Sequence, residues 1–263
     1  EGLPAEVRPR VRELNASFGR VRQAFAAQQD FVADAAHELR SPLAALKLQA
    51  QGLRRAADDA ARERAVARLE AGMDRAARLV EQLLVLARQE AASSPMQPVD
   101  LLEVARLALA DVAASAQARG IDAGLAPSVQ GPRVVEGVPE ELRLLVRNLL
   151  DNAIKYSAEG GRVDVAVESG EAGVSLLVQD SGPGVPEEER QRVLGRFYRS
   201  PQSAQQAPGS GLGLAIVQTI ARRHGARLVL QPSQALGGLC VRVGFPATGK
   251  GREGPAGSPA LTQ

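Results

Sequence analysis

The sequence predicts an α+β protein: a dimeric antiparallel four-helix bundle with two helices per chain, followed by an α/β sandwich domain. Two observations support this class. Apolar residues follow a heptad repeat through about the first third of the chain, as in helices that pack along a seam. Beyond a stretch rich in Ala, Ser and Pro at 91–98, which we interpret as a linker, strand-like and helix-like patterns alternate. Such alternation predicts a sheet covered by helices.

Composition narrows the class of protein. The 263 residues suffice for two modest domains. The 32 Lys and Arg nearly balance the 30 Asp and Glu, and arginine is interleaved with acidic residues. The sequence therefore shows no basic patch of the kind that binds nucleic acid. The single Cys240 excludes an internal disulfide and argues against a cysteine metal site. We find neither an apolar run of about 18 residues nor a signal peptide, and because the first residue is Glu1 we expect a fragment.

A helix expected at about 11–55 presents a histidine to solvent. On the heptad register His37 falls at position f, furthest from the seam, where a neutral imidazole offers a lone pair. A surface histidine without a role is the ordinary alternative. Pro42 favours function, because it distorts the helix beside the carbonyl of Glu38. The seam comprises Val11, Leu14, Phe18, Val21, Phe25, Gln28, Val32, Ala35, Leu39, Pro42, Leu46, Gln49 and Leu53.

A second heptad helix follows a polar connection at Asp58 and Asp59. Two such helices with a short link form an antiparallel hairpin. One hairpin has two apolar edges and cannot bury both, so we expect a homodimer. A monomeric hairpin packed on the second domain is the alternative. The expected second seam is Val66, Leu69, Met73, Ala76, Val80, Leu83 and Ala87.

The remaining elements are read from periodicity and turn residues. We expect His224 to cap the negative end of its helix rather than to bind a ligand, with Gly225 ending that helix. The Gly- and Pro-rich stretch 248–263 is expected to be disordered. The expected elements are a helix at 99–118, strands at 121–125 and 133–138, a helix at 139–156, a strand hairpin at 163–167 and 174–178, a helix at 211–224, and strands at 227–231 and 239–245.

Polar groups on the helix at 139–156 form one candidate site. Asn148, Asn152 and Lys155 lie at spacings of four and seven, on one stripe opposite a leucine-rich face. Two carboxamides and an ammonium suit a magnesium-phosphate ligand, although an ordinary solvated face is the alternative.

Two glycine-containing turns follow. Asp180 ends an apolar strand just before Gly182 and Gly184, where a carboxylate accepts a hydrogen bond from an exocyclic amine such as that of adenine, or merely closes an Asx turn. The glycine-rich stretch 209–213 leads into a helix, whose amino end attracts anions. Neither GxGxxG nor GxxxxGK[ST] occurs.

The order of these motifs resembles the cytoplasmic part of a sensor histidine kinase of a two-component system. Residues 37–43 (HELRSPL) resemble the phosphoacceptor box, 145–156 the asparagine box, 180–184 and 209–213 two glycine boxes, and 196–199 (RFYR) the aromatic box. The resemblance implies the end of a HAMP signalling coiled coil at 1–25, a dimerisation and phosphotransfer hairpin at 26–92, a catalytic ATP-binding domain of the Bergerat (GHKL) type at 93–247, and a tail at 248–263.

The resemblance also implies roles for single residues. His37 would accept the γ-phosphoryl group of ATP, and Glu38 would orient the ring and take its proton. Ser41 stands where the family has Thr or Asn, which is thought to place water for dephosphorylating the partner. Asn148 would coordinate Mg²⁺. Nucleotide contacts would come from Asn152, Lys155, Tyr156, Asp180, Gly182, Gly184, Arg196, Arg199, Gly209, Gly211, Gly213 and Leu214.

The implied partners are a second copy of the chain and the receiver domain of a response regulator. Nucleic acid is not among them, and contact with a bacterial inner membrane would be made only through a missing upstream segment. Two alternatives share features with this interpretation. An ATPase clamp of the same fold carries a glutamate base where Asn148 stands, and asparagine cannot take a proton from water. The other is a catalytically inactive dimeric scaffold.

Overall fold

The computed structural model describes residues 8–56, 58–87, 95–126, 131, 133–200 and 210–247. The chain divides into two compact units, Glu1–Leu84 and Val85–Gln263, which are described separately. Among the helices that the structure describes, none combines the length and apolarity needed to cross a membrane.

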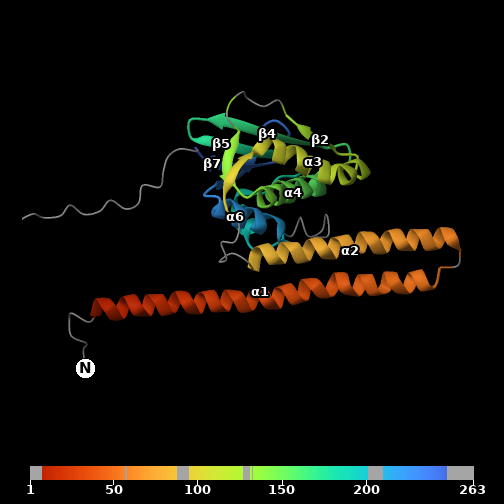
Figure 1. Ribbon diagram of the computed structural model, residues 1–263, viewed down its shortest axis with the longest axis horizontal. Coiled ribbons are helices and arrows are strands. Elements are labelled where there is room, and N and C mark those ends of the chain that lie inside the picture. Colours follow the sequence, from red (N-terminus) through yellow and green to blue (C-terminus); the bar gives the residue numbers. More distant parts are fainter. Residues whose placement is uncertain are drawn as a thin grey trace, which may run out of the picture. The chain divides into compact units, whose positions relative to one another are not determined.

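The helical unit contains two long antiparallel helices, α1 (Arg8–Arg54) and α2 (Asp59–Ala87) (Figure 1). The expected hairpin is therefore confirmed. Asp58 and Asp59 do more than link the helices: Asp58 Oδ1 accepts a hydrogen bond of 2.6 Å from the Ala61 N–H, and Asp59 begins α2. Carboxylates are favoured there because the amino end of a helix has unpaired N–H groups and positive polarity.

The predicted seam of α1 is confirmed where α2 lies alongside it. Every seam position from Ala35 to Leu53 is half-buried, whereas His37 is exposed. Further toward the amino end, Phe18 and Phe25 are 58% and 61% exposed. With 47 residues against 29, α1 extends well beyond the described length of α2, so α2 does not cover this part of its seam.

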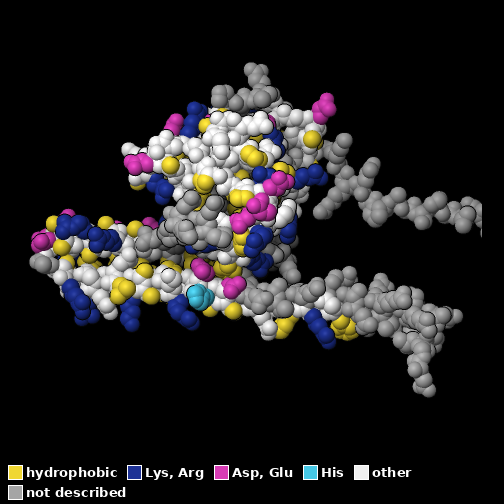
Figure 2. Space-filling model, turned by 180° about the vertical axis from the view of Figure 1, so that it is seen from behind, with side chains coloured by type: hydrophobic (Ala, Val, Ile, Leu, Met, Phe, Trp, Pro, Cys, Tyr) yellow, Lys and Arg dark blue, Asp and Glu magenta, His cyan; other side chains and the backbone are white. Residues whose placement is uncertain are grey.

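In the single chain, the predicted seam of α2 is divided between residues that are buried or half-buried (Leu69, Ala76 and Leu83) and residues that are exposed. Val66, Met73 and Val80 are 37%, 50% and 42% exposed, because α2 has two apolar edges one residue apart and turns the other edge toward α1. Gly72 marks the close approach: a Cβ there would lie 2.5 Å from Gln49 Oε1. Hydrophobic side chains are visible on the surface of both long helices (Figure 2). The inward edge is Leu69, Gly72, Ala76, Leu79 and Leu83.

The second unit is built on a mixed five-stranded sheet of order β2-β4-β5-β7-β6, in which only β2 and β4 pair in parallel. Helices α3, α4 and α6 form the second layer (Figure 1). A separate ribbon pairs β1 with β3. The bounds are β1 Gln97–Asp100, α3 Leu101–Ala118, β2 Asp122–Leu125, β3 Val134–Gly137, α4 Pro139–Tyr156, β4 Arg162–Gly170, β5 Gly173–Asp180, short 3₁₀ turns Glu187–Glu189 and Arg192–Leu194, α6 Gly213–Arg223, β6 Arg227–Pro232 and β7 Leu239–Pro246.

The core lies between the sheet and α4. Alternate residues of β4 and β5 point inward, and the register places Val165 opposite Val178 and Val167 opposite Leu176. From α4, one apolar stripe including Leu145, Leu149 and Leu150 is buried against them. The period of 3.6 thus leaves the opposite stripe of α4 available for polar side chains.

Two predicted boundaries are corrected. Strand β1 is formed by residues 97–100. Of these, we expected 97 and 98 in the linker, and Val99 and Asp100 in the following helix. This strand is too short to show a clear alternation, and Asp100 then caps α3 by accepting from the Leu102 N–H at 2.8 Å. The helix expected from residue 211 begins at Gly213, because Gly211 adopts a left-handed backbone with φ of +70°. The expected disorder at 248–263 lies outside the described residues.

Candidate functional site

The candidate phosphoacceptor group lies on α1. His37 and Ser41 are exposed, four residues apart on one face of the helix, and Glu38 is half-buried beside them. Pro42 lies within the helix as expected. The arrangement presents an imidazole to solvent next to a carboxylate able to accept a proton.

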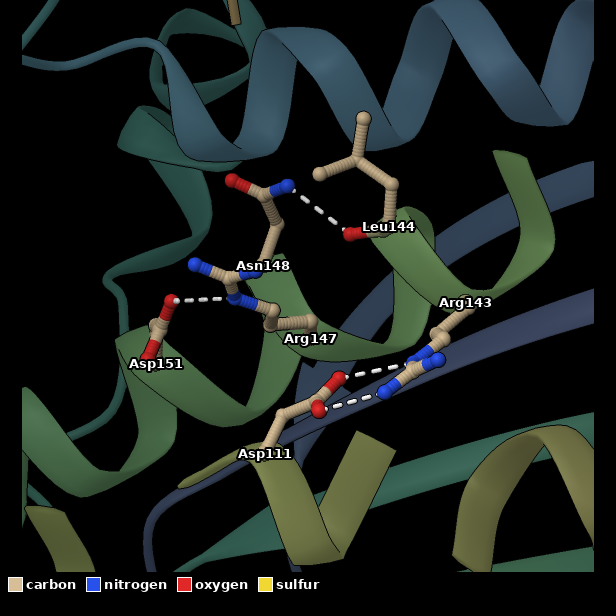
Figure 3. Close-up of polar contacts among 6 residues, drawn as sticks. All are labelled: Asp111, Arg143, Leu144, Arg147, Asn148 and Asp151. Atoms are coloured by element: carbon tan, nitrogen blue, oxygen red, sulfur yellow. Dashed lines mark hydrogen bonds and ion pairs between the residues drawn. The ribbon is translucent and has the colours of Figure 1, made fainter. Parts of the chain in front are cut away.

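The two amides of α4 meet the amino end of α6. Asn148 is buried, and its Nδ2 donates to the Leu144 carbonyl at 2.8 Å, which fixes the orientation of the amide (Figure 3). A Cβ on Gly213, the first residue of α6, would lie 3.0 Å from Asn152 Nδ2 and 3.5 Å from Asn148 Oδ1. The N-cap residue, Leu212, makes no side-chain capping hydrogen bond, so this helix end is uncapped by that residue. Amide oxygens beside an uncapped helix amino end suit an anion that carries a hard cation.

Further along α4, Lys155 and Tyr156 are half-buried at the end of the same polar stripe. The Lys155 ammonium lies 4.7 Å from the centre of the Tyr156 ring, a cation–π distance. Asp151 forms an ion pair of 3.9 Å with Arg147 one turn earlier (Figure 3). Lys155 therefore lies on the same stripe as the two amides, one turn beyond Asn152.

Asp180 is buried at the end of β5. Its Oδ1 accepts from the Gly182 N–H at 2.9 Å and from the Leu239 N–H at 3.1 Å. Burial raises the pKa of this carboxyl group, and the two N–H donors oppose that shift. The Asx turn is thus confirmed. The adenine contact stays a prediction, for which Oδ2, not used in either bond, is the candidate acceptor.

Glycines make room around Asp180. A Cβ on Gly182 would lie 2.9 Å from the Tyr156 carbonyl oxygen, and one on Gly238 would overlap the Asp180 carboxylate. Gly184 has φ of +73°, which an L side chain rarely adopts. Sequence reasoning missed Gly238 and Leu239; the glycine pair that ends in Gly238, just before the last strand, was the available signal.

The aromatic segment packs against the glycine-rich turn. A Cβ on Gly211 would lie 2.7 Å from the carbonyl carbon of Phe197, itself at φ of +59°. The Tyr198 hydroxyl donates to Glu189 at 3.3 Å, and the Arg192 guanidinium lies 4.7 Å from the centre of the Tyr198 ring. Of the remaining predicted residues, Arg196 is exposed, Arg199 and Leu214 are half-buried, and Gly209 lies outside the described residues.

The second unit therefore brings together the α4 stripe, the amino end of α6 and the Asp180 turn, while His37, Glu38 and Ser41 belong to the helical unit. In the part of the chain that the structure describes, no three His, Cys, Asp or Glu side chains form a metal-binding cluster. The oxygen-rich amide set nevertheless fits Mg²⁺, because that ion is usually held by few protein oxygens together with phosphates and water.

Two family models match the chain. The His Kinase A (phospho-acceptor) domain matches residues 27–92, and the Histidine kinase-, DNA gyrase B-, and HSP90-like ATPase matches residues 137–249. The sensor protein QseC of Escherichia coli O157:H7 is 46% identical over 232 residues, which are 85% of this chain and 49% of that protein. The chain thus spans about half the length of the curated relatives it matches.

Two solved structures share the fold. The Acinetobacter baumannii histidine kinase AdeS aligns with a TM-score of 0.62 at 21% identity, over 81% of this chain and 98% of that one. Histidine kinase ThkA in complex with the response regulator protein TrrA aligns with a TM-score of 0.65 at 20% identity, over 86% and 64%. A phosphoacceptor helical region followed by an ATP-binding α/β domain defines the protein-histidine kinases. The chain belongs to the sensor histidine kinase family.

Proposed function

We propose that the protein transfers the γ-phosphoryl group of ATP to His37 and passes it to an aspartate of a response-regulator receiver domain. The observation that carries this proposal is the placement of Asn148 and Asn152 against the uncapped amino end of α6. Oxygen donors and a positively polarised helix end are what a magnesium-bound triphosphate requires.

The triphosphate would lie between α4 and α6. Asn148 would hold Mg²⁺ through Oδ1, since Nδ2 is already bonded to Leu144. Bound magnesium supplies neutralisation of the phosphate charge. Asn152 and the Lys155 ammonium would contact the phosphates from α4, with Tyr156 beside them. On the facing side the contacts would come from the backbone of Gly211, Gly213 and Leu214; Gly209, for which a nucleotide contact is also expected, lies outside the described residues.

The base would bind at the end of β5. Asp180 Oδ2 would accept a hydrogen bond from the exocyclic amine of adenine, because Oδ1 already serves Gly182 and Leu239. Gly182 and Gly184 would leave space for the ring. The pKa of Asp180, raised by burial, fits this role, since a buried carboxylate gains from a further hydrogen-bond donor.

In the transfer step, a ring nitrogen of His37 attacks the γ-phosphorus with its lone pair. The bond from phosphorus to the β,γ-bridging oxygen breaks and leaves ADP, while the proton on the other ring nitrogen passes to Glu38. Arg196 and Arg199 would stabilise the charge on the moving group. The receiver aspartate then takes the phosphoryl group from His37, and Ser41 would place water for its later hydrolysis.

A second copy of the chain is the expected partner of the helical unit, because the apolar edge of α2 that includes Val66, Met73 and Val80 is exposed in one chain. The receiver-domain partner is supported by ThkA, a kinase of the same fold whose complex with a response regulator is known. We further propose that the chain is the cytoplasmic part of a bacterial inner-membrane sensor, with the domain bounds expected from its sequence; its curated relatives are bacterial sensor proteins.

Incubation with ATP labelled in the γ-phosphate tests the proposal. The wild-type chain should acquire an acid-labile, alkali-stable label, His37→Gln should abolish it, and Asn148→Ala should abolish it together with magnesium-dependent ATP binding. Release of phosphate without labelling would identify an ATPase clamp instead. Absence of both labelling and hydrolysis would identify an inactive scaffold.

A further inference from the structure

His224 joins two helices through both of its ring nitrogens. The side chain is buried at the carboxyl end of α6, where Nε2 accepts from the Val138 N–H at 3.0 Å and Nδ1 lies 2.8 Å from the Ile220 carbonyl oxygen. Since the Val138 amide can only donate, Nε2 must be the acceptor and Nδ1 must carry the proton. The expected contact with the helix's negative end is confirmed, and the bond to Val138 is an addition that the sequence did not indicate.

Val138 is the N-cap residue, directly before the first residue of α4. Its side chain makes no capping hydrogen bond, and the following Pro139 has no N–H. The imidazole therefore ties the start of α4 to the end of α6. A Cβ on Gly137 would lie 2.9 Å from His224 Cδ2 and 3.2 Å from Nε2, so the ring edge lies directly on the backbone before α4.

A second link reinforces this end of the helix pair. Arg223, next to His224, forms an ion pair with Glu141 in the first turn of α4. At the opposite end of the same pair, Gly213 of α6 meets Asn152 and Asn148 of α4. The two helices are thus fixed at one end by His224, while the amino end of α6 and the turns of α4 that face it form the candidate triphosphate site.

We propose that His224 is a positioning residue for nucleotide binding: its Nε2 acceptor fixes α6 along α4 and so sets the separation between Gly213 and the amides of Asn148 and Asn152. The effect on ATP binding rests on the proposed function, whereas the placement of α6 along α4 by His224 does not. An α6 released from Val138 would place its amino end less well against α4, and preorganisation of the site would be lost.

Two matched variants separate the ring's hydrogen bonds. The amide of glutamine reaches as far from the backbone as Nε2, so His224→Gln keeps an acceptor for the Val138 N–H. The amide of asparagine reaches only as far as Nδ1, so His224→Asn keeps the Ile220 bond and loses the Val138 bond. Gly137→Ala crowds the same ring from the other side, together with the buried Leu142 side chain, and leaves residue 224 unchanged.

The measurements are the calorimetric dissociation constant for MgATP, the labelling rate of His37 at saturating ATP, and amide hydrogen exchange of residues 210–217 without nucleotide. We expect His224→Asn and Gly137→Ala to weaken ATP binding about fivefold, the effect of one net hydrogen bond. Both variants should speed amide exchange at 210–217. Both should leave the labelling rate at saturating ATP within about twofold, because a loss of ground-state and transition-state binding in equal measure changes the affinity and not the saturated rate. His224→Gln should match the wild type in all three.

Equal behaviour of the Gln and Asn variants, whether both normal or both impaired, would overturn the proposal, because the Val138 acceptor would then not matter. Failure of the wild-type chain to bind ATP would instead overturn the proposed function. In that case the exchange comparison still decides the role of His224 in placing α6.

Discussion

Asp111 of α3 and Arg143 of α4 form a bidentate ion pair, with Arg143 Nε 2.8 Å from Oδ2 and Nη2 2.5 Å from Oδ1 (Figure 3). This hydrogen bonding lowers the pKa of Asp111, an effect to which the charges of Arg143 and Arg147 add and which partial burial opposes. A carboxyl group whose pKa is lowered by folding stabilises the fold when ionised, and that contribution disappears as the pH falls through its folded-state pKa.

Asp111→Asn should therefore lower the free energy of unfolding near pH 7 by about 0.5–1 kcal/mol, since the pair is partly exposed. The difference from wild type should shrink in acid, below the ordinary carboxyl value of 3.8. Denaturant unfolding at several pH values measures this. Glu103→Gln, which breaks an exposed pair with Arg106 on the same helix, is the control and should cost less. A pH-independent difference would contradict the assignment.

Asp180 gives the opposite pH dependence. Because burial raises its pKa, folding disfavours the ionised form of Asp180 relative to the unfolded chain. Asp180→Asn should keep an acceptor for Gly182 and Leu239, match or exceed wild-type stability at pH 7, and converge with wild type as acid protonates Asp180. Its ATP affinity should fall, because an amide N–H₂ would face the adenine amine.

Asp180→Ala should instead destabilise by about 2–4 kcal/mol, because two buried N–H groups lose their acceptor. Melting curves of both variants from pH 7 to pH 4, with and without ATP, provide the measurement. An asparagine variant as unstable as the alanine variant would show that the carboxylate charge, rather than the acceptor, holds the turn.

Gly213→Ala should separate stability from binding. Alanine is the better helix former by up to about 1 kcal/mol, so the fold should be as stable as wild type or more so. Its Cβ would crowd Asn152, and ATP affinity should fall severalfold by calorimetry. Gly225→Ala is the matched control, because φ of +63° makes it destabilising by about 1–2 kcal/mol while no atom lies within 4 Å. Normal ATP binding by Gly213→Ala would argue against the site.

Val80→Glu should disrupt the homodimer. Val80 is 42% exposed on the outer apolar edge of α2, and a carboxylate buried there between copies would weaken association on the order of 100-fold. Sedimentation equilibrium measures the change. Glu81→Lys alters charge on an exposed neighbouring position and should leave the dimer intact. An unaffected Val80→Glu dimer would place the interface elsewhere.

The sequence predicted secondary structure correctly where a periodic pattern of apolar residues extends over many residues. The pattern of α4 predicted 139–156, the bounds observed, because its leucine stripe and Pro139 both mark the helix. Strand β1 was not predicted, because four residues are too few to show an alternation of apolar and polar side chains and because Pro98 suggested a linker. Which edge of α2 faces α1 within one chain could not be predicted, because two apolar edges, offset by one residue, fit the heptad equally well.

In the candidate site, contacts between residues close in sequence could be predicted, whereas contacts between residues distant in sequence could not. Asp180 and Gly182 belong to one turn, so their bond followed from the sequence. Leu239 donates to the same carboxylate from 59 residues away, and His224 reaches Val138 across 86. Such pairs arise from strand order and helix packing, which single-sequence patterns do not encode.

Pro42 lies five residues after His37 in a helix of 47 residues. It has no amide hydrogen to give to the carbonyl of Glu38, so the rod is softest to bending beside the histidine. A force that bends α1 from its amino end would bend it first at this point. Such bending would change the orientation of the His37 imidazole before it changed the turn between α1 and α2.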